Sequence, residues 1–149
     1  MLAEKRALRA KALADATLIS LLGGSYVYQR AADIVFESLF AAGAKAIITY
    51  WWVTGGVVEE DTGLSDQTYQ FDVWSKSSDD ADAAAERLDV IIPWSPRLPG
   101  SGTLPALTGR RLANVITSEA VPPDQVDMSE AGGTLHHKVR SYRVRTYPA

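Results

Sequence analysis

The hydrophobic pattern changes period once within residues 66–94, and this change predicts a strand followed by a helix. Tyr69, Phe71 and Val73 alternate with polar residues, as in a half-buried β-strand. Beyond residue 79 the apolar side chains recur at helical spacing, and Pro93 ends the run because proline cannot continue a helix. These apolar positions are Ala81, Ala84, Ala85, Leu88, Ile91 and Ile92.

Capping residues support this helix. Ser77 or Ser78 can accept a hydrogen bond from the free N–H groups of its first turn. Asp79, Asp80 and Asp82 follow, where the helix dipole favours negative charge. The whole stretch predicts a strand packed under a helix and indicates no chemistry.

The N-terminal part of the chain also has helical character. Residues 3–13 are good helix formers. Asp15 is a candidate N-cap for a second short helix over residues 16–22, which Gly23 and Gly24 would end. One continuous helix through both segments is the alternative.

Five further segments favour regular structure. Residues 26–28 and 46–54 favour extended chain, and residues 33–42 favour a short helix. Residues 112–120 and 135–147 favour two more strands.

In the last of these segments the apolar residues move from one face of the expected strand to the other. Leu135 and Val139 share one face of the strand, whereas Tyr142 and Val144 share the other. A bulge near residues 140–141 would explain this shift.

Glycine and proline mark two long connections. Gly55 and Gly56 open a segment through Ser65 that we expect to form a long hairpin arm or loop. Frequent Pro and Gly over residues 93–109 predict a long loop, and such loops in compact domains are commonly functional or disordered. Residues 124–133 are acidic and rich in turn formers.

Several strands with few long helices predict an α+β fold. We expect an antiparallel sheet of about four to five strands, with helices packed on one face and a long hairpin arm. The length of 149 residues fits a single domain over residues 1–149. The expected core joins apolar residues of helices and strands: Leu8, Leu18, Leu22, Ile48, Tyr50, Phe71, Val73, Leu88, Ile91, Val115 and Val139.

The charge balance disfavours a nucleic-acid-binding protein. The 15 Lys and Arg against 18 Asp and Glu give a formal net charge of −3, whereas DNA binders usually carry a basic excess. The chain has no cysteine, which excludes disulfides and thiolate metal sites. No signal peptide or membrane-spanning stretch is visible, so we expect a protein made in a cytoplasm, without a membrane partner.

Few residues are candidates for catalysis or metal binding. His136 and His137 are adjacent, so on a regular strand they point to opposite faces and cannot clamp one ion. No serine stands in a nucleophile elbow, and no glycine-rich phosphate-binding fingerprint is present. We therefore expect no enzyme, cofactor or metal.

A carboxylate cluster lies in the expected arm: Glu59, Glu60, Asp61 and Asp66. An acid/base pair must be held rigidly in differing environments, which a segment flanked by glycines does poorly. A hard-cation site is possible, because calcium takes carboxylates from loops. A solvated, charged arm is the favoured interpretation.

The last predicted strand is basic, through Lys138, Arg140, Arg143 and Arg145. With the tryptophans at positions 51, 52 and 74, it could form a platform for single-stranded nucleic acid. Given the acidic total charge, we favour arginines that meet acidic loops of the same or a neighbouring subunit.

Three segments of the chain carry a family resemblance. The first begins Leu8-Arg9-Ala10-Lys11-Ala12 and passes through Leu21-Leu22-Gly23 to Val27-Tyr28. The second is Phe71-Asp72-Val73-Trp74-Ser75, which precedes a polar turn and an alanine-rich helix. The third is the closing Tyr142-Arg143-Val144-Arg145. They resemble the tail terminator (tail completion) family of long-tailed bacteriophages, which has relatives in gene transfer particles. Segments 31–44 and 93–109 are longer than the family's typical connections.

The resemblance implies a structural virion protein with no cofactor and no catalytic residue. Subunits of this family assemble into a homo-oligomeric ring, commonly a hexamer, that caps the tail tube, stops its polymerisation and joins the tail to the head connector. The implied partners are further copies of the chain, the tail tube protein and a head completion or connector protein, with phage DNA only as passing cargo. The implied place is the head-proximal end of a virion tail assembled in a bacterial host.

Ring contacts of this kind are head-to-tail and close by rotation. We expect them at the hairpin arm, the 93–109 loop and the basic final strand, because Trp and Arg are favoured at interfaces. The candidate interface residues are Trp51, Trp52, Glu59, Glu60, Asp61, Arg97, Arg110, Arg111, Arg140 and Arg143.

Three other functions stay open. One is a head–tail adaptor or neck protein, which differs from a terminator only in its partners. Another is a small enzyme with a carboxylate site among Glu59, Asp61 and Asp66. The weakest is a nucleic-acid-binding module, which would show strongly salt-dependent binding of DNA.

Overall fold

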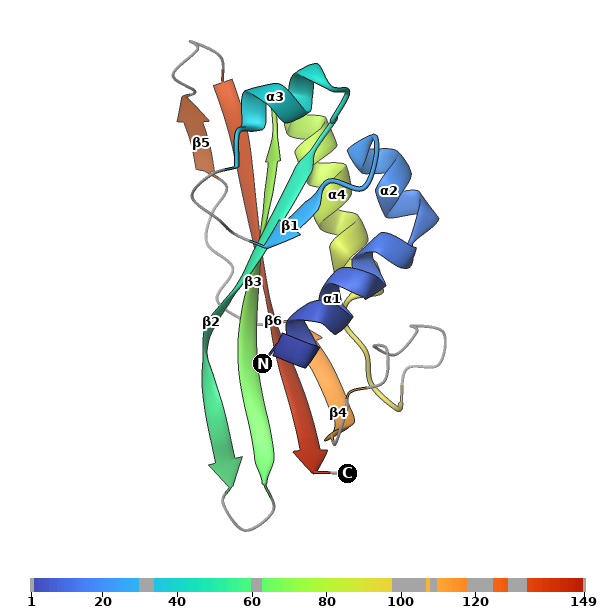
Figure 1. The fold of residues 1–149 in the computed structure, drawn as a ribbon, viewed down its shortest axis with the longest axis vertical. Coiled ribbons are helices and arrows are strands. Elements are labelled where there is room, and N and C mark those ends of the chain that lie inside the picture. The colour runs from blue at the N-terminus through green and yellow to red at the C-terminus, as the bar shows by residue number, and fades with distance from the viewer. Residues whose placement is uncertain are drawn as a thin grey trace.

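The computed structural model describes residues 2–29, 34–59, 63–97, 107, 110–117, 125–128 and 134–148. Within these ranges the helices are α1 (Leu2–Ala14), α2 (Ala16–Leu22), α3 (Phe36–Ala41) and α4 (Ser78–Ile91). The strands are β1 (Val27–Gln29), β2 (Ile47–Glu59), β3 (Leu64–Ser75), β4 (Arg110–Thr117), β5 (Gln125–Met128) and β6 (Thr134–Pro148). Figure 1 shows their arrangement.

The strands form one open, six-stranded sheet. Its order is β1-β2-β3-β6-β4, and β5 pairs with the other end of β6. The predicted α+β fold with an antiparallel sheet is confirmed for every pair except β1 and β2, which run parallel. Parallel neighbours need a crossover connection, and the segment that contains α3 supplies it.

Helices α1, α2 and α4 cover one face of the sheet and enclose the core (Figure 1). Every residue expected in the core is buried, and only Val139 lies outside the main cluster. Full burial of a large apolar side chain contributes about 1.5–3 kcal/mol, so this cluster is the main stabilising element of the fold.

Helix α3 lies apart from the other helices, at one end of the sheet (Figure 1). The ring centroid of Phe36 is 5.1 Å from that of Trp74. Since Val73 faces the core, Trp74 points to the opposite face of β3. α3 therefore contacts the face that the helical layer leaves open.

The predicted caps are present. Asp15 Oδ1 accepts a hydrogen bond from Leu18 N at 2.7 Å, so the N-terminal helical run is two helices rather than one. Gly23 ends α2 in a left-handed conformation, with φ of 79°, that glycine adopts at little cost. Ser77 caps α4, where its hydroxyl accepts from Asp80 N.

The predicted bulge in the last strand is wrong. β3 and β6 pair in one continuous register from Ser65 to Ser75 of β3. Val139 is buried on one face of β6 and Tyr142 on the other. The shift of apolar residues between odd and even positions therefore reflects burial of different faces of β6 at Val139 and at Tyr142, without an extra residue in the strand. The register shifts that the sheet does contain lie in its β2–β3 and β4–β6 pairings.

The acidic segment 124–133, expected to be turn-rich, contains β5. This four-residue strand pairs with β6 from Thr134 to His137. Its backbone hydrogen bonds come from β6, so its own polar composition is a poor guide to its structure. The strand expected over residues 112–120 is β4, and residues 118–120 lie outside the described residues.

Candidate assembly surfaces

The predicted hairpin arm is formed by β2 and β3. Their antiparallel pairing continues to Glu59 and Leu64, and this end of the sheet extends beyond the helices (Figure 1). At Gly55 an added Cβ would lie 2.4 Å from Asp66 O, so only glycine fits this close approach. Glu60 and Asp61 lie outside the described residues.

Asp66 is the anionic centre of the arm. Its side chain is 9% exposed and binds two arginines of the neighbouring strand: Arg143 through both carboxylate oxygens, and Arg145 with Nε 3.2 Å from Oδ2. Burial raises the pKa of Asp66, but the hydrogen bonds and charges of the two arginines outweigh it and hold the pKa below its usual value. Asp66 is therefore a charged structural partner and is poorly suited to act as an acid.

The other cations of β6 pair with α4. Lys138 Nζ lies 2.5 Å from Asp82 Oδ1, and Arg140 Nε lies 2.9 Å from Asp89 Oδ2. Tyr142 donates its hydroxyl to the other oxygen of Asp89 at 2.7 Å. The basic strand thus meets carboxylates of its own chain, as the favoured interpretation expected, but these lie on a helix and a strand rather than on loops.

Arg110 stabilises the end of the arm through three hydrogen bonds. Its Nη2 donates to Gly63 O and to Thr146 O, both at 2.8 Å, and its Nε donates to Thr146 Oγ1 at 3.0 Å. One side chain of β4 therefore ties the β2–β3 turn to β6. Arg97 and Arg111, by contrast, are exposed.

The first two tryptophans of the candidate interface sit on the arm-forming strand β2. Trp52 is partly buried against the core, and its Nε1 donates to Gln67 Oε1 at 2.7 Å. Trp51, its neighbour on the strand, is half-buried and points to the opposite face. Both rings are partly buried, and Trp52 is also held by its hydrogen bond, whereas stacking of nucleic-acid bases requires an exposed aromatic face.

The histidine pair is divided between the two faces of β6, as predicted. His137 stacks on Trp74 with ring centroids 3.8 Å apart, and its Nε2 lies 2.8 Å from Asp72 Oδ1. Trp74 in turn donates to Thr49 Oγ1 at 3.1 Å. These contacts join β2, β3 and β6 on the open face of the sheet, which is a structural role.

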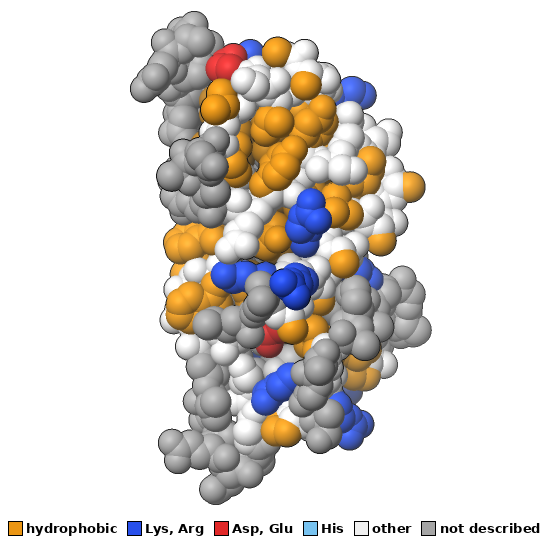
Figure 2. Space-filling view, in the orientation of Figure 1, with side chains coloured by type: hydrophobic (Ala, Val, Ile, Leu, Met, Phe, Trp, Pro, Cys, Tyr) orange, Lys and Arg blue, Asp and Glu red, His pale blue; other side chains and the backbone are white. Residues whose placement is uncertain are grey.

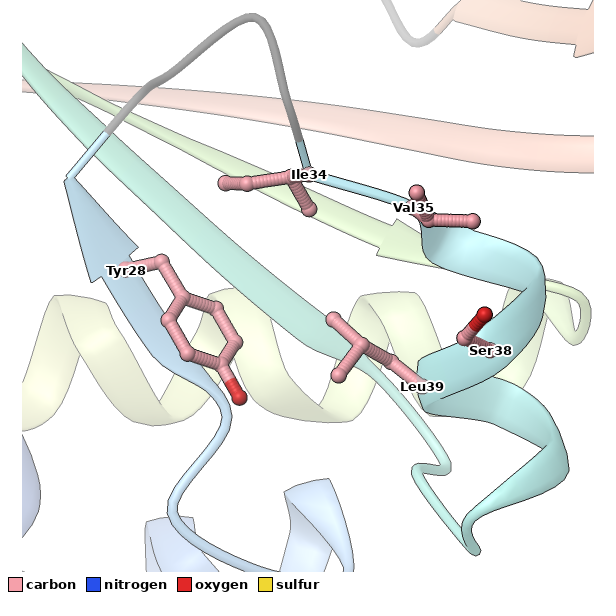
Figure 3. Close-up of a pocket in the computed structure, with 5 residues that line it drawn as sticks. All are labelled: Tyr28, Ile34, Val35, Ser38 and Leu39. Atoms are coloured by element: carbon pink, nitrogen blue, oxygen red, sulfur yellow. The ribbon is translucent and has the colours of Figure 1, made fainter.

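An apolar pocket of about 370 Å³ lies between β1 and α3 (Figure 3). Its lining is Tyr28, Ile34, Val35, Ser38 and Leu39, with the hydroxyls of Tyr28 and Ser38 as its polar side-chain groups. A catalytic site needs titratable or nucleophilic groups that converge, and this lining does not supply them. Within the described residues no group of three or more His, Asp or Glu could hold a metal ion, and no helix is long and apolar enough to cross a membrane.

The sequence analysis missed two features of these surfaces. Asp82 and Asp89 are seven residues apart, so they lie on one side of α4, and this spacing could have indicated partners for a basic strand. The three hydrogen bonds of Arg110 could not be predicted from the sequence pattern, because Gly63 and Thr146 are distant in sequence.

No protein-family model matches the chain, and no curated protein matches it. Among solved structures, the chain is similar to a chain of the virion of a native gene transfer agent particle. The TM-score is 0.63 at 16% sequence identity, and the match covers 96% of this chain and 93% of that one. At this identity the likeness shows a shared fold, which extends over nearly the full length of both chains.

Proposed function

We propose that the chain is a structural virion protein of the tail terminator type. Its copies would form a ring that caps the tail tube, stops tube polymerisation and joins the tail to the head connector. The observation that carries this proposal is the fold shared with a gene transfer agent virion chain over 96% of the residues. The terminator role rests in addition on the three segments that resemble that family.

The shape of the subunit supports a ring-forming role. A closed ring needs two different surfaces on each subunit, related by a rotation. The arm extends past the helical layer, and Arg110 holds its turn against β4 and β6 (Figure 1). A braced projection of this kind is suited to reach a neighbouring subunit or the tube end.

The enzyme alternative has lost part of its support. It required Asp66 as one of three carboxylates, and Asp66 is held by Arg143 and Arg145. The nucleic-acid alternative is weakened too, because the cations of β6 are neutralised by carboxylates of the same chain.

A head–tail adaptor is the second candidate. The likeness to a chain of the gene transfer agent virion fits it as well, because the fold alone does not fix the position of the chain in the particle. Retention of the protein by the portal-side connector in the absence of tail tube protein would favour the adaptor.

The direct test is tube growth. Purified tail tube protein of the same particle is polymerised with and without the chain, and tube lengths are measured by electron microscopy. We expect capped, shorter tubes with the intact chain. A variant in which Asn-Gly replaces residues 59–64 keeps a hairpin turn but loses the arm end, and should cap poorly while folding normally. Tubes of unchanged length with the intact chain would rule out the terminator role.

A further inference from the structure

The helical layer presents two flanks toward opposite edges of the sheet. α1 crosses the sheet: near its start Glu4 accepts a hydrogen bond from Tyr69 of β3, and farther along Arg9 Nε donates to Val27 O of the edge strand β1 at 3.1 Å. α4 lies over β6, to which Asp82 and Asp89 are bound by ion pairs. Since β2 and β3 separate β1 from β6 in the sheet, the C-terminal half of α1 and the side of α4 that carries Asp82 and Asp89 lie toward different edges of the sheet.

The outer side of α1 is basic. Arg6 and Arg9 are exposed and Lys5 is half-buried, while the opposite side of the helix packs into the core through Leu8 and Ala12. Lys5 and Arg6 form no ion pair within the described residues. Figure 2, in the orientation of Figure 1, shows Lys and Arg side chains across the middle of this face and few Asp or Glu.

The outer side of α4 is acidic. Asp79 and Glu86 are exposed and carry no ion pair in the described part of the chain. Asp82 and Asp89 line the same side, and both keep side-chain exposure of more than a third in spite of their partners on β6. Arg87 points the other way, to Asp15 between α1 and α2, so the acidic side faces away from α1.

We propose that the acidic flank of α4 in one copy of the chain docks on the basic flank of α1 in the next copy. This inference rests on the ring of the proposed function. Two complementary but different surfaces give a head-to-tail contact, which is the kind that closes into a ring by rotation. The opposite charges of Arg6 and Glu86, both exposed and without an ion pair in the described structure, identify a second copy as the occupant. Small side chains at Ala10 and Ala83 allow the helices to approach closely.

Individual exposed ion pairs are weak and are screened by salt, so the contact depends on several of them acting together at every subunit boundary. The proposed contact does not use the cations of β6, which already have partners inside the chain. Raising the ionic strength should therefore weaken ring assembly and leave the fold of the subunit unchanged.

Charge exchange tests the contact. Arg6→Glu places a negative charge on the α1 flank opposite Glu86, and Glu86→Arg places a positive charge on the α4 flank opposite Arg6. Each variant alone should assemble at least about tenfold less well than the unchanged chain. An equimolar mixture should recover assembly, because alternating copies restore opposite charges between positions 6 and 86 at every boundary. Lys45→Glu, at an exposed residue that belongs to neither α1 nor α4, is the control for net charge and should assemble normally.

Crosslinking gives an independent readout, because the chain has no native cysteine. A chain with Arg6→Cys and Glu86→Cys should form a ladder of disulfide-linked oligomers that ends at one closed species, whereas Lys45→Cys with Glu86→Cys should not. Normal rings from both charge variants, with no crosslinking, would overturn the contact and leave the proposed function standing. Failure of the unchanged chain to form any ring, alone or on tail tubes, would overturn both.

Discussion

The two ends of the sheet are stabilised differently. In the helix-covered region (residues 47–52 of β2, 69–75 of β3 and 138–142 of β6), aromatic and aliphatic side chains are buried under α1, α2 and α4. The arm region comprises residues 53–59 of β2, 64–68 of β3, 143–148 of β6 and 110–114 of β4. Among its described side chains, most of those that are buried are polar: Ser65, Asp66, Gln67 and Thr146, beside Leu64 and Val144.

Under the proposed function, this difference would let folding and assembly depend on different parts of the sheet. Apolar burial involves no titrating group, so the core of the helix-covered region should depend less on pH than the arm region does. The ion pairs and hydrogen bonds of the arm region depend on both conditions. An arm of this kind can be altered by mutation without unfolding the subunit, which is what a contact surface requires.

The largest effect should come from Phe71→Ala in the helix-covered region. Phe71 is fully buried between Tyr50 and Tyr142, with ring centroids 5.7 and 5.6 Å away. The truncation should lower the free energy of unfolding by about 3–5 kcal/mol, because it removes apolar contacts and leaves a cavity. Urea denaturation followed by circular dichroism measures it, and a loss below about 1 kcal/mol would mean that Phe71 is not central to the core.

Asp66→Asn should have the next largest effect, in the arm region. It leaves Arg143 and Arg145 without their anion and should cost about 1–3 kcal/mol at neutral pH, toward the low end because both arginines are partly exposed. Thermal unfolding and the hydrogen exchange of residues 64–68 would report the change.

The effect of Asp66→Asn should also depend on pH. The pKa of Asp66 is lower in the folded than in the unfolded chain, so its contribution is complete above the unfolded value of about 3.9. It is lost as the pH falls through the folded value. The gap in stability between the two proteins should be constant from neutral pH to about 5 and close below about 4. A gap that stays constant down to pH 2 would contradict an ionised Asp66 as its cause.

Arg110→Lys should have a smaller, local effect. A lysine keeps the charge but cannot reproduce the forked contacts with Gly63 and Thr146, which we expect to cost about 1 kcal/mol. Hydrogen exchange should rise at residues 63–66 and stay unchanged in the helix-covered region. Uniformly faster exchange would indicate that Arg110 supports the whole fold rather than the arm.

The smallest effect should follow Glu37→Gln. Its ion pair with Lys76 spans 3.2 Å, and both side chains are about half exposed. Exposed pairs of this kind contribute little, so the change in stability should stay within about 0.5 kcal/mol. The same denaturation experiment measures it and provides the reference for removal of a carboxylate outside the arm.

Local patterns predicted the helices and their ends well. The caps at Asp15, Gly23 and Ser77 depend on side chains next to the helix itself, so the sequence contains all the information that places them. The predicted core residues are buried for a similar reason, since period and hydrophobicity identify the face that packs.

Long-range pairing was harder to predict. The change from odd to even apolar positions between Val139 and Tyr142 was interpreted as a bulge, because a simple alternation assumes that one face is buried along the whole strand. β5 was overlooked because a short strand takes its hydrogen bonds from its partner. The partners of Asp66 and Arg110 lie dozens of residues away in sequence, and only the register of the sheet brings them together.

The most direct test of the proposed ring-forming role is the solution mass of the protein by light scattering, alone and mixed with tail tube protein, over a range of concentration and salt. With a subunit of 16.1 kDa, we expect a closed species of about six copies, formed in free solution or on the tube end and lost as salt is raised. A chain that stays monomeric at every concentration, and that neither binds the tube protein nor changes its polymerisation, would contradict this function.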